Sequence, residues 1–290
     1  MIAAVDGLPD VTFRTGEAEL ESLRGELVSF VREQVEAADA EGVVVPVSGG
    51  IDSTLTAYLC VEALGADSVT ALVLPCTLTD AENTIDAHAV LERLGVEPTK
   101  TQLQPMLDIF EDSVAPAVSA ESDRRAVGNV IARLRMVVAY YAANMTDRLV
   151  CGTSNRTELL LGYVTKYGDA AADMRPIAGL YKTEVRAMAR HLDVPTDIVE
   201  KTPTAGLWAG QTDESELGAP YGLLDVVLHE LVEKNLGIEG TAAALGIDES
   251  FVARYAHRIV KNRHKREPIP SPDEGRSDAE PLFYELEDRV

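Results

Sequence analysis

Residues 43–53, VVVPVSGGIDS, constrain the fold of this chain more than any other segment. A short apolar run breaks into small residues and ends on Asp52 and Ser53, directly before a helical pattern. This order predicts a buried strand, a tight loop and a helix N-terminus, whose unpaired N–H groups and partial positive charge favour an anion. A second apolar run at 68–74 predicts a parallel neighbouring strand, reached through a helix at 54–64. Ligands in such sheets bind at the carboxyl ends of the strands, where this loop lies.

The loop carries groups suited to a phosphate chain. Gly49 and Gly50 let the backbone approach an anion closely. Ser48 and Ser53 add hydroxyl groups, and Asp52 can hold a divalent cation against the same phosphates. The Gly-Lys-Ser/Thr of the ordinary P-loop is missing. The segment resembles the SGGxDS pyrophosphate loop of the N-type ATP pyrophosphatases, which split ATP into AMP and pyrophosphate. The structural alternative is a strand-to-helix turn that merely needs small residues.

The chain is strongly acidic, with a formal net charge of −22 over 290 residues and seven lysines among its 26 basic residues. Such a surface predicts a protein kept soluble at high salt, where self-repulsion is screened, and argues against a broad nucleic-acid-binding face. No stretch approaches the roughly 18 consecutive apolar residues of a membrane span, and the first residues lack a secretion signal, so a cytoplasmic protein is expected. Cys60, Cys76 and Cys151 occur singly in apolar runs, which favours buried reduced thiols over catalytic or metal-bound ones.

Hydrophobic periodicity predicts how the rest of the chain is organised. Helices are expected at residues 17–37, 124–144, 182–192, 221–236 and 240–263, and a further buried strand at 148–153. Residues 202–221 are rich in Gly, Pro, Thr and Asp without periodicity, and so long a loop in a compact domain is usually functional. The expected division is one α/β domain at 1–267, with an N-terminal helix at 17–38 and C-terminal helices at 221–263, followed by an acidic tail at 268–290.

Several polar residues follow strand ends or open helices. Arg133 and Arg135 point to different helix faces, so either one reaches a phosphate or carboxylate or both are solvated. Thr153 follows a strand, where it can contact a nucleotide, while Glu158 has a simple helix-capping role as its structural alternative. Lys182 opens a helix against the macrodipole, a mismatch that a bound phosphate would offset.

Six strings in this order resemble the ammonia-dependent NAD⁺ synthetases, over residues 43–266. They are SGGIDS, GNVIARLRM, GTSNRTELLLGYVTKYGDAAAD, RPIAGLYKTEV, PTAGLWAGQTDESELG and HKR. SGGxDS alone identifies the superfamily, whereas GYxTKYGDxxxD and AGLWxGQTDExELG are far more specific. The resemblance implies a doubly wound, mainly parallel five-stranded sheet with helices on both faces, of the adenine nucleotide alpha-hydrolase-like type, plus C-terminal helices.

The resemblance also implies a ligase that forms a C–N bond in the last step of NAD⁺ biosynthesis. The nicotinate carboxylate of deamido-NAD⁺ attacks the α-phosphate of ATP, which releases pyrophosphate and gives an adenylate. Ammonia then attacks the activated carbonyl and expels AMP. Because two anions must meet in the first step, metal and cationic groups are expected to carry much of the catalysis.

The matching motifs imply these site residues. ATP is bound by Pro46, Val47, Ser48, Gly49, Gly50, Ile51, Asp52, Ser53, Thr153, Lys182 and Thr204. Deamido-NAD⁺ is bound by Arg133, Lys166, Asp173, His264 and Lys265. Mg²⁺ is held by Asp52 and Glu158, and the catalytic residues are Asp52, Lys182 and Asp173. Asp173 either helps to orient or deprotonate ammonium or only binds substrate.

Family members form homodimers with the dinucleotide across the interface, so some of these residues are expected to serve the partner's site. The loop at 202–221 would close over the reaction and exclude water. Glutamine-dependent relatives carry an extra amidase domain, for which this chain has no room, so free ammonia or ammonia from a separate partner is expected.

Two rival functions are less consistent with the sequence. A tRNA-thiolating member of the superfamily would need paired cysteines or a basic RNA-binding surface. A non-catalytic nucleotide-binding module would have no reason to keep Asp52, Glu158, Lys182 and the long loop together.

Overall fold

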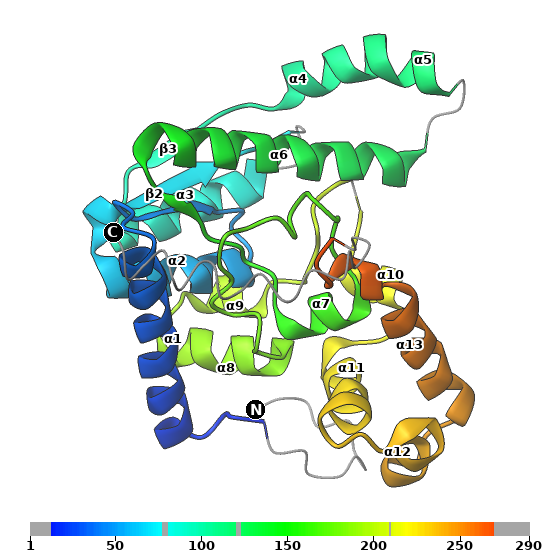
Figure 1. Cartoon of the computed structure of the whole chain (residues 1–290). Coiled ribbons are helices and arrows are strands. Elements are labelled where there is room, and N and C mark those ends of the chain that lie inside the picture. The colour runs from blue at the N-terminus through cyan, green and yellow to red at the C-terminus, as the bar shows by residue number, and fades with distance from the viewer. Residues whose placement is uncertain (1–12, 77–80, 120–122, 209, 270–290) are drawn as a thin grey trace, which may run out of the picture.

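The computed structural model describes residues 13–76, 81–119, 123–208 and 210–269 (Figure 1). These residues form a parallel sheet whose strands are β1 (Val43–Pro46), β2 (Val69–Val73), β3 (Pro98–Lys100) and β4 (Leu149–Val150), in the order β3-β2-β1-β4. β1 pairs in parallel with β2 on one side and with β4 on the other. The chain winds from β1 out to β3 and then returns to the far side of β1, so a topological switch point lies at the carboxyl ends of β1 and β4. The predicted doubly wound α/β fold is confirmed.

The expected number of five strands is wrong for the described part of the chain, where the sheet has four. Beyond β4 there is a single parallel bridge between Cys151 and Met174. Gly152 N–H donates to the Met174 carbonyl at 2.8 Å, but Pro176 follows two residues later. Because proline has no N–H to donate and the chain turns at 175–178, the ladder ends after one bridge.

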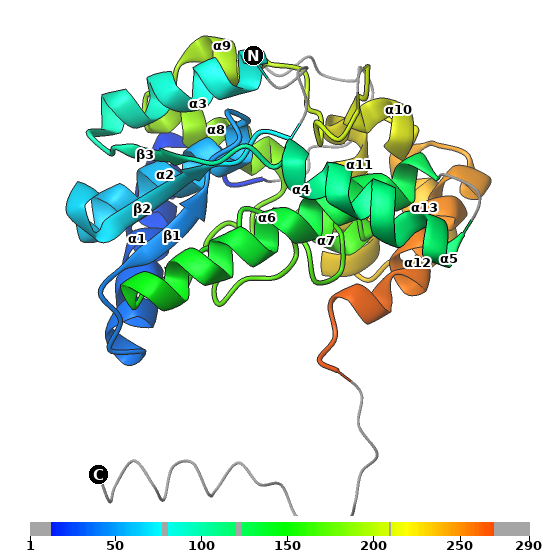
Figure 2. The ribbon, with the colours of Figure 1, turned by 90° about the horizontal axis from the view of Figure 1, so that it is seen from above.

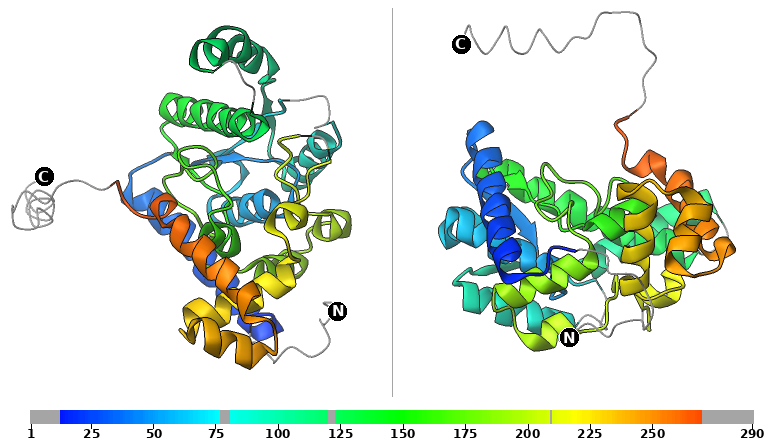
Figure 3. Two further views of the ribbon diagram at one scale, coloured as in Figure 1. Left: turned by 90° about the vertical axis from the view of Figure 1, so that its right-hand side faces the viewer. Right: turned by 90° about the horizontal axis from the view of Figure 1, so that it is seen from below.

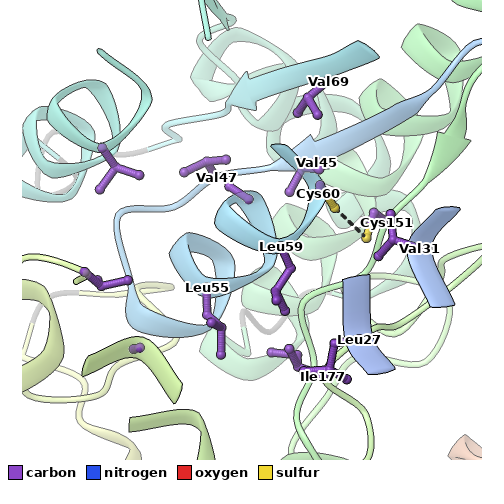
Figure 4. Close-up of a cluster of buried hydrophobic side chains, with 14 of the residues drawn as sticks. Leu27, Val31, Val45, Val47, Leu55, Leu59, Cys60, Val69, Cys151 and Ile177 are labelled. Atoms are coloured by element: carbon purple, nitrogen blue, oxygen red, sulfur yellow. Dashed lines mark hydrogen bonds between the residues drawn. The ribbon is translucent and has the colours of Figure 1, made fainter. Parts of the chain in front are cut away.

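Helices cover both faces of the sheet (Figures 1 and 2). One face carries α1 (Glu17–Ala37), α2 (Ile51–Leu64) and α8 (Lys182–His191), and the other carries α6 (Arg124–Thr146). The residues of β1 alternate between the two apolar clusters, because Val43 and Val45 pack with α1, α2 and α8 whereas Val44 packs with α6. Figure 4 shows the first cluster, where Leu55 and Leu59 of α2 are fully buried.

The remaining helices are α3 (Ala81–Leu94), α4 (Gln104–Ile109), α5 (Ala115–Val118), α7 (Arg156–Leu161), α9 (Thr196–Glu200), α10 (Asp213–Leu217), α11 (Tyr221–Leu228), α12 (Gly237–Leu245) and α13 (Glu249–Lys261). Short 3₁₀ turns occupy Ala66–Ser68 and Arg263–Lys265, and π-helical turns occupy Phe110–Val114 and His229–Glu233. α4 and α5 stack outside α6 (Figures 1 and 3). α11, α12 and α13 gather at one end of the molecule (Figure 2), which faces the viewer in the left panel of Figure 3.

The helices predicted at 17–37, 54–64, 124–144 and 182–192 are confirmed with small shifts at their ends. The single helix predicted at 240–263 is wrong. Gly246 has φ +65° and ends α12, and Asp248 then caps α13 by accepting from Ser250 N–H at 2.7 Å. The loop predicted at 202–221 contains the short helix α10. The division into one domain and a tail stays a prediction, since residues 270–290 lie outside the described part.

The three cysteines are buried, as predicted. Cys60 Sγ of α2 lies 3.6 Å from Cys151 Sγ at the end of β4 (Figure 4). Among the described residues, none of the helices has the length and apolar character required to span a bilayer.

Candidate active site

The loop between β1 and α2 is closed by its own serines. Ser48 N–H donates to Ser53 Oγ at 3.1 Å, and Ser53 Oγ donates to the Gly50 carbonyl at 3.0 Å. The two hydroxyl oxygens lie 3.0 Å apart. Since Ile51 begins α2, and the first N–H groups of a helix have no partner within it, this end of α2 offers donors to a phosphate.

Gly49 allows the loop to approach α3. Its φ is +79°, and a Cβ at this position would lie 2.2 Å from the carbonyl oxygen of Asn83 and 3.1 Å from Ala87 N. An alanine therefore meets both backbone strain and a backbone clash here. Gly49 sets the path of the loop by fitting it against the first turns of α3.

A buried cation lies at the end of this loop. Lys182 is the first residue of α8, and its side chain is 2% exposed. Its ammonium group donates to Asp52 Oδ2 and, at 3.5 Å, to Glu158 Oε1. Asn155 Nδ2 donates to the other Asp52 oxygen at 2.8 Å. The first turns of α2, α7 and α8 thus bring two carboxylates and one ammonium group together.

When both are ionised, the two carboxylates carry one negative charge more than Lys182 balances. Burial and then the nearby Asp52 raise the pKa of Glu158, and because Lys182 offsets them only in part, the pKa is about 8. Burial alone would lower the pKa of Lys182, but Asp52 and Glu158 outweigh that effect and raise it. The ammonium group therefore stays charged.

These groups line a cavity of about 800 Å³, a volume typical of small-molecule sites. Thr153 and Thr204 also line it, together with Leu207 and Trp208 from the loop that precedes α10. Leu207 and Trp208 pack over Gly128 of α6, where a Cβ would lie 3.1 Å from Leu207 Cδ1. The loop therefore lines the cavity and packs against α6 at the same time.

The family model for NAD synthase matches residues 23–269, which is most of the chain. The chain belongs to the NAD synthase family. It is 43% identical over 275 residues to the NH(3)-dependent NAD(+) synthetase of Halobacterium salinarum, and the match covers 93% of this chain and 100% of that protein. The resemblance on which the sequence interpretation rests is therefore confirmed.

Solved structures of NAD synthase relatives have the same fold. The NH3-dependent NAD synthetase from Campylobacter jejuni, in complex with the nitrate ion, is 31% identical with a TM-score of 0.73, over 88% of this chain and 99% of that chain. The NMN synthetase from Francisella tularensis is 32% identical with a TM-score of 0.73, over 88% and 98% of the two chains.

The predicted ATP-site residues of this NAD synthase homologue converge. The cavity is lined by Pro46, Val47, Ser48, Gly50, Ile51, Asp52, Ser53, Thr153, Glu158, Lys182 and Thr204, and Gly49 lies behind the loop against α3. Their individual roles stay predictions, but all except Gly49 line the same cavity.

The predicted dinucleotide residues are more dispersed. Within the described part of the chain, Lys265 lines the cavity, where its ammonium group donates to the carbonyls of residues 162 and 164, whereas the other four do not line it. Arg133 Nη2 donates to the Lys166 carbonyl at 3.1 Å on the exposed side of α6. Asp173 accepts from Val150 N–H at 2.7 Å and from a tyrosine hydroxyl, and His264 is exposed. The residues predicted to bind the dinucleotide therefore do not all line one cavity within the described part of a single chain.

Sequence reasoning missed several groups around Lys182. Asn155 caps α7 and orients Asp52. The Tyr221 ring centroid lies 5.0 Å from Lys182 Nζ, and its hydroxyl donates to Asp213 Oδ2 at 2.9 Å. Asp225 is fully buried on α11. A carboxylate inside the apolar run YGLLDVVL is the signal that could have identified Asp225, since a buried charge needs partners.

The donor set suits a divalent cation. Among the described residues, no group of three or more His, Cys, Asp or Glu side chains is placed to hold a metal by itself. Mg²⁺ is usually bound through one or two carboxylates together with substrate phosphates. Asp52 and Glu158, two carboxylates that lie together beside the loop at 48–53, fit that pattern.

Proposed function

We propose that this protein catalyses the ATP-dependent amidation of deamido-NAD⁺ by ammonia, giving NAD⁺, AMP and pyrophosphate. The observation that carries the proposal is the buried Lys182, held by Asp52 and Glu158 at the end of the phosphate loop and inside a nucleotide-sized cavity. Membership of the NAD synthase family and the named relatives support the same reaction.

Different residues of the site act on different parts of ATP during adenylate formation. The 48–53 loop and the start of α2 bind the pyrophosphate part of ATP, and Lys182 donates to a phosphate oxygen whose negative charge grows as the carboxylate attacks. Since Lys182 is already buried and oriented, little reorganisation is needed when charge develops. Asp52 and Glu158 would hold Mg²⁺, which supplies further charge neutralisation for the phosphates when bound.

The second step requires that water be kept from the adenylate. We infer that the loop carrying Leu207 and Trp208, which lines the cavity and packs on α6, excludes this water. The Arg124 guanidinium lies 4.7 Å from the Trp208 ring centroid. Gln211 Oε1 accepts from Leu207 N–H at 2.8 Å and holds the loop in this shape. A covered cavity favours ammonia over bulk water as the nucleophile.

We further propose a homodimer in which the exposed face of α6 contacts the partner. Val137, Tyr141 and Met145 recur every four residues on α6, with Tyr141 and Met145 each 67% exposed. Arg133, one turn earlier on the same stripe, is a predicted dinucleotide residue that does not line its own chain's cavity. Such a dimer would bring Arg133 and Lys166 to the partner's site. A role for Asp173 with ammonium and a cytoplasmic location are part of the same proposal.

The experiment is a complete reaction with purified protein. With ATP, Mg²⁺, deamido-NAD⁺ and ammonium, the protein should form NAD⁺ and AMP in equal amounts, and omitting any one component should stop both products. Nicotinate mononucleotide replaces deamido-NAD⁺ in a parallel reaction, because one structural relative is an NMN synthetase. Glutamine replaces ammonium in another and should give little product. AMP release that is independent of deamido-NAD⁺ would show that the acceptor is wrongly assigned.

The dimer is tested separately by light scattering after size-exclusion chromatography. Tyr141→Asp should shift the wild-type dimer towards monomer and raise the KM for deamido-NAD⁺, because a charge in an apolar interface is costly. A monomeric wild-type protein with full activity would contradict this part of the proposal.

A further inference from the structure

One buried carboxylate contacts both helices that carry the charged groups of the site. Asp225 of α11 is 0% exposed. Its Oδ1 accepts from Thr157 Oγ1 at 2.6 Å, and its Oδ2 accepts from Thr183 N–H and from Thr183 Oγ1, both at 2.7 Å. Thr157 belongs to the first turn of α7 and Thr183 to the first turn of α8. A single side chain therefore joins the starts of two helices.

The two threonines are next to the charged residues in the sequence. Thr157 precedes Glu158, and Thr183 follows Lys182. The Lys182 N–H also donates to Thr157 Oγ1 at 3.1 Å, so α7 and α8 are linked directly as well as through Asp225. Any movement of Asp225 would therefore change the separation between the Glu158 carboxylate and the Lys182 ammonium group.

Packing alone does not require an acid at this position. α11 is otherwise apolar and packs against α7 and α8, and a buried carboxylate costs solvation energy that its hydrogen bonds must offset. Burial raises the pKa of Asp225, while the hydrogen bonds from Thr157 and Thr183 act in the opposite direction. At the start of α8 a carboxylate also matches the helix dipole, which Lys182 opposes.

We propose that Asp225 is a positioning residue for the reaction, which sets the distance and orientation of Lys182 relative to Glu158. This inference rests on the proposed function, because that function assigns Lys182 to the phosphates of ATP and Glu158 to Mg²⁺. Tyr221, one turn earlier on α11, lies against the Lys182 ammonium group, so the same helix supports the cation from two points.

The test compares Asp225→Asn with a matched control, Glu230→Gln. Glu230 is also a buried acid just after α11, but its partners are His229 and Lys234 rather than α7 or α8. In Asp225→Asn the amide cannot accept from both threonines, so the first turns of α7 and α8 should shift. We expect kcat to fall by about 10- to 100-fold, the cost of a small misplacement, with the KM for deamido-NAD⁺ almost unchanged. Glu230→Gln should lower the melting temperature and leave kcat within twofold.

A binding measurement separates this inference from the proposed function. The affinity for a non-hydrolysable ATP analogue is measured by calorimetry at increasing Mg²⁺ concentrations, which needs no amide formation. Asp225→Asn should bind the analogue about tenfold more weakly than wild type, and Glu230→Gln should bind as wild type does. If wild type binds the analogue but makes no NAD⁺, the proposed function fails while the binding comparison still tests the role of Asp225.

If Asp225 only stabilised the fold, Asp225→Asn and Glu230→Gln would have similar effects on kcat and on the affinity for the analogue. Asp225→Asn with kcat and analogue affinity within twofold of wild type would overturn the inference. Should that variant fail to fold, Thr183→Val and Thr183→Ser take its place, because valine removes the hydroxyl that contacts Asp225 and serine retains it. A lower kcat in Thr183→Val, with a kcat near that of the wild type in Thr183→Ser, supports the inference. Equal kcat values in the two variants overturn it.

Discussion

Replacing Gly49 with alanine tests whether the phosphate loop is held by its close approach to α3. The φ of +79° costs a non-glycine residue about 1–2 kcal/mol. The added Cβ would lie 2.2 Å from the Asn83 carbonyl oxygen, so loop and helix must separate by about 1 Å, and overpacking of this kind costs about 1–3 kcal/mol. Together these effects predict a loss of about 2–5 kcal/mol in the free energy of unfolding.

Gly50→Ala is the matched control for this experiment. Gly50 has φ −89°, and its Cβ would lie 3.4 Å from Ser48 Oγ, so alanine fits without strain. Its cost is limited to weaker capping of α2, at most about 1 kcal/mol.

Both variants are unfolded in urea and followed by circular dichroism, without nucleotide. Gly49→Ala should also lose more kcat/KM for ATP than stability alone explains, because the displaced loop misplaces the phosphates. Equal unfolding free energies for the two variants would refute the reasoning, since both place a methyl group in the same loop.

Three further outcomes are expected. Asp52→Asn should keep the fold, because the amide can still accept from Asn155, yet lower AMP formation by about 100-fold or more through loss of the charge; near-normal turnover would remove Asp52 from the site. The pKa of Glu158 rises from 4.5 to about 8 on folding, so folding stabilises its protonated form. In EDTA, the unfolding free energy of the wild type should therefore fall relative to that of Glu158→Gln as the pH increases through that range. Parallel profiles of unfolding free energy against pH would contradict the shift. Activity and melting temperature should both rise towards molar KCl, because salt screens the repulsion within a chain of net charge −22, whereas a flat response would exclude salt adaptation.

Local features predicted part of the candidate ATP site. The apolar run of β1, the glycines and the start of α2 are contiguous, and the rule that ligands lie at strand ends pointed to Thr153. Lys182 was indicated by its place at a helix start and by the family resemblance. The contact between Asp225 and the start of α8 could not be predicted in this way. Asp225 and Thr183, 42 positions apart, meet only because α11 packs against α8, and no local pattern encodes that contact.

The errors have similar physical origins. Apolar periodicity continues across Gly246, so it predicts one helix where the positive φ of the glycine ends α12. The fifth strand ends after a single bridge because Pro176 cannot extend the ladder. The first expectation came from a side-chain pattern and the second from the family resemblance, and in both cases a backbone property of one residue decides the outcome.

The buried cysteines give this protein an internal reporter of opening. Cys60 and Cys151 belong to the apolar cluster under α2, and Cys76 belongs to the cluster under α6 on the opposite face of the sheet. All three sulfurs are buried, so a thiol reagent in solution reaches them only when the packing around them opens. Labelling rates at Cys76 and at the Cys60–Cys151 pair would therefore report opening around the two clusters separately, without any introduced probe.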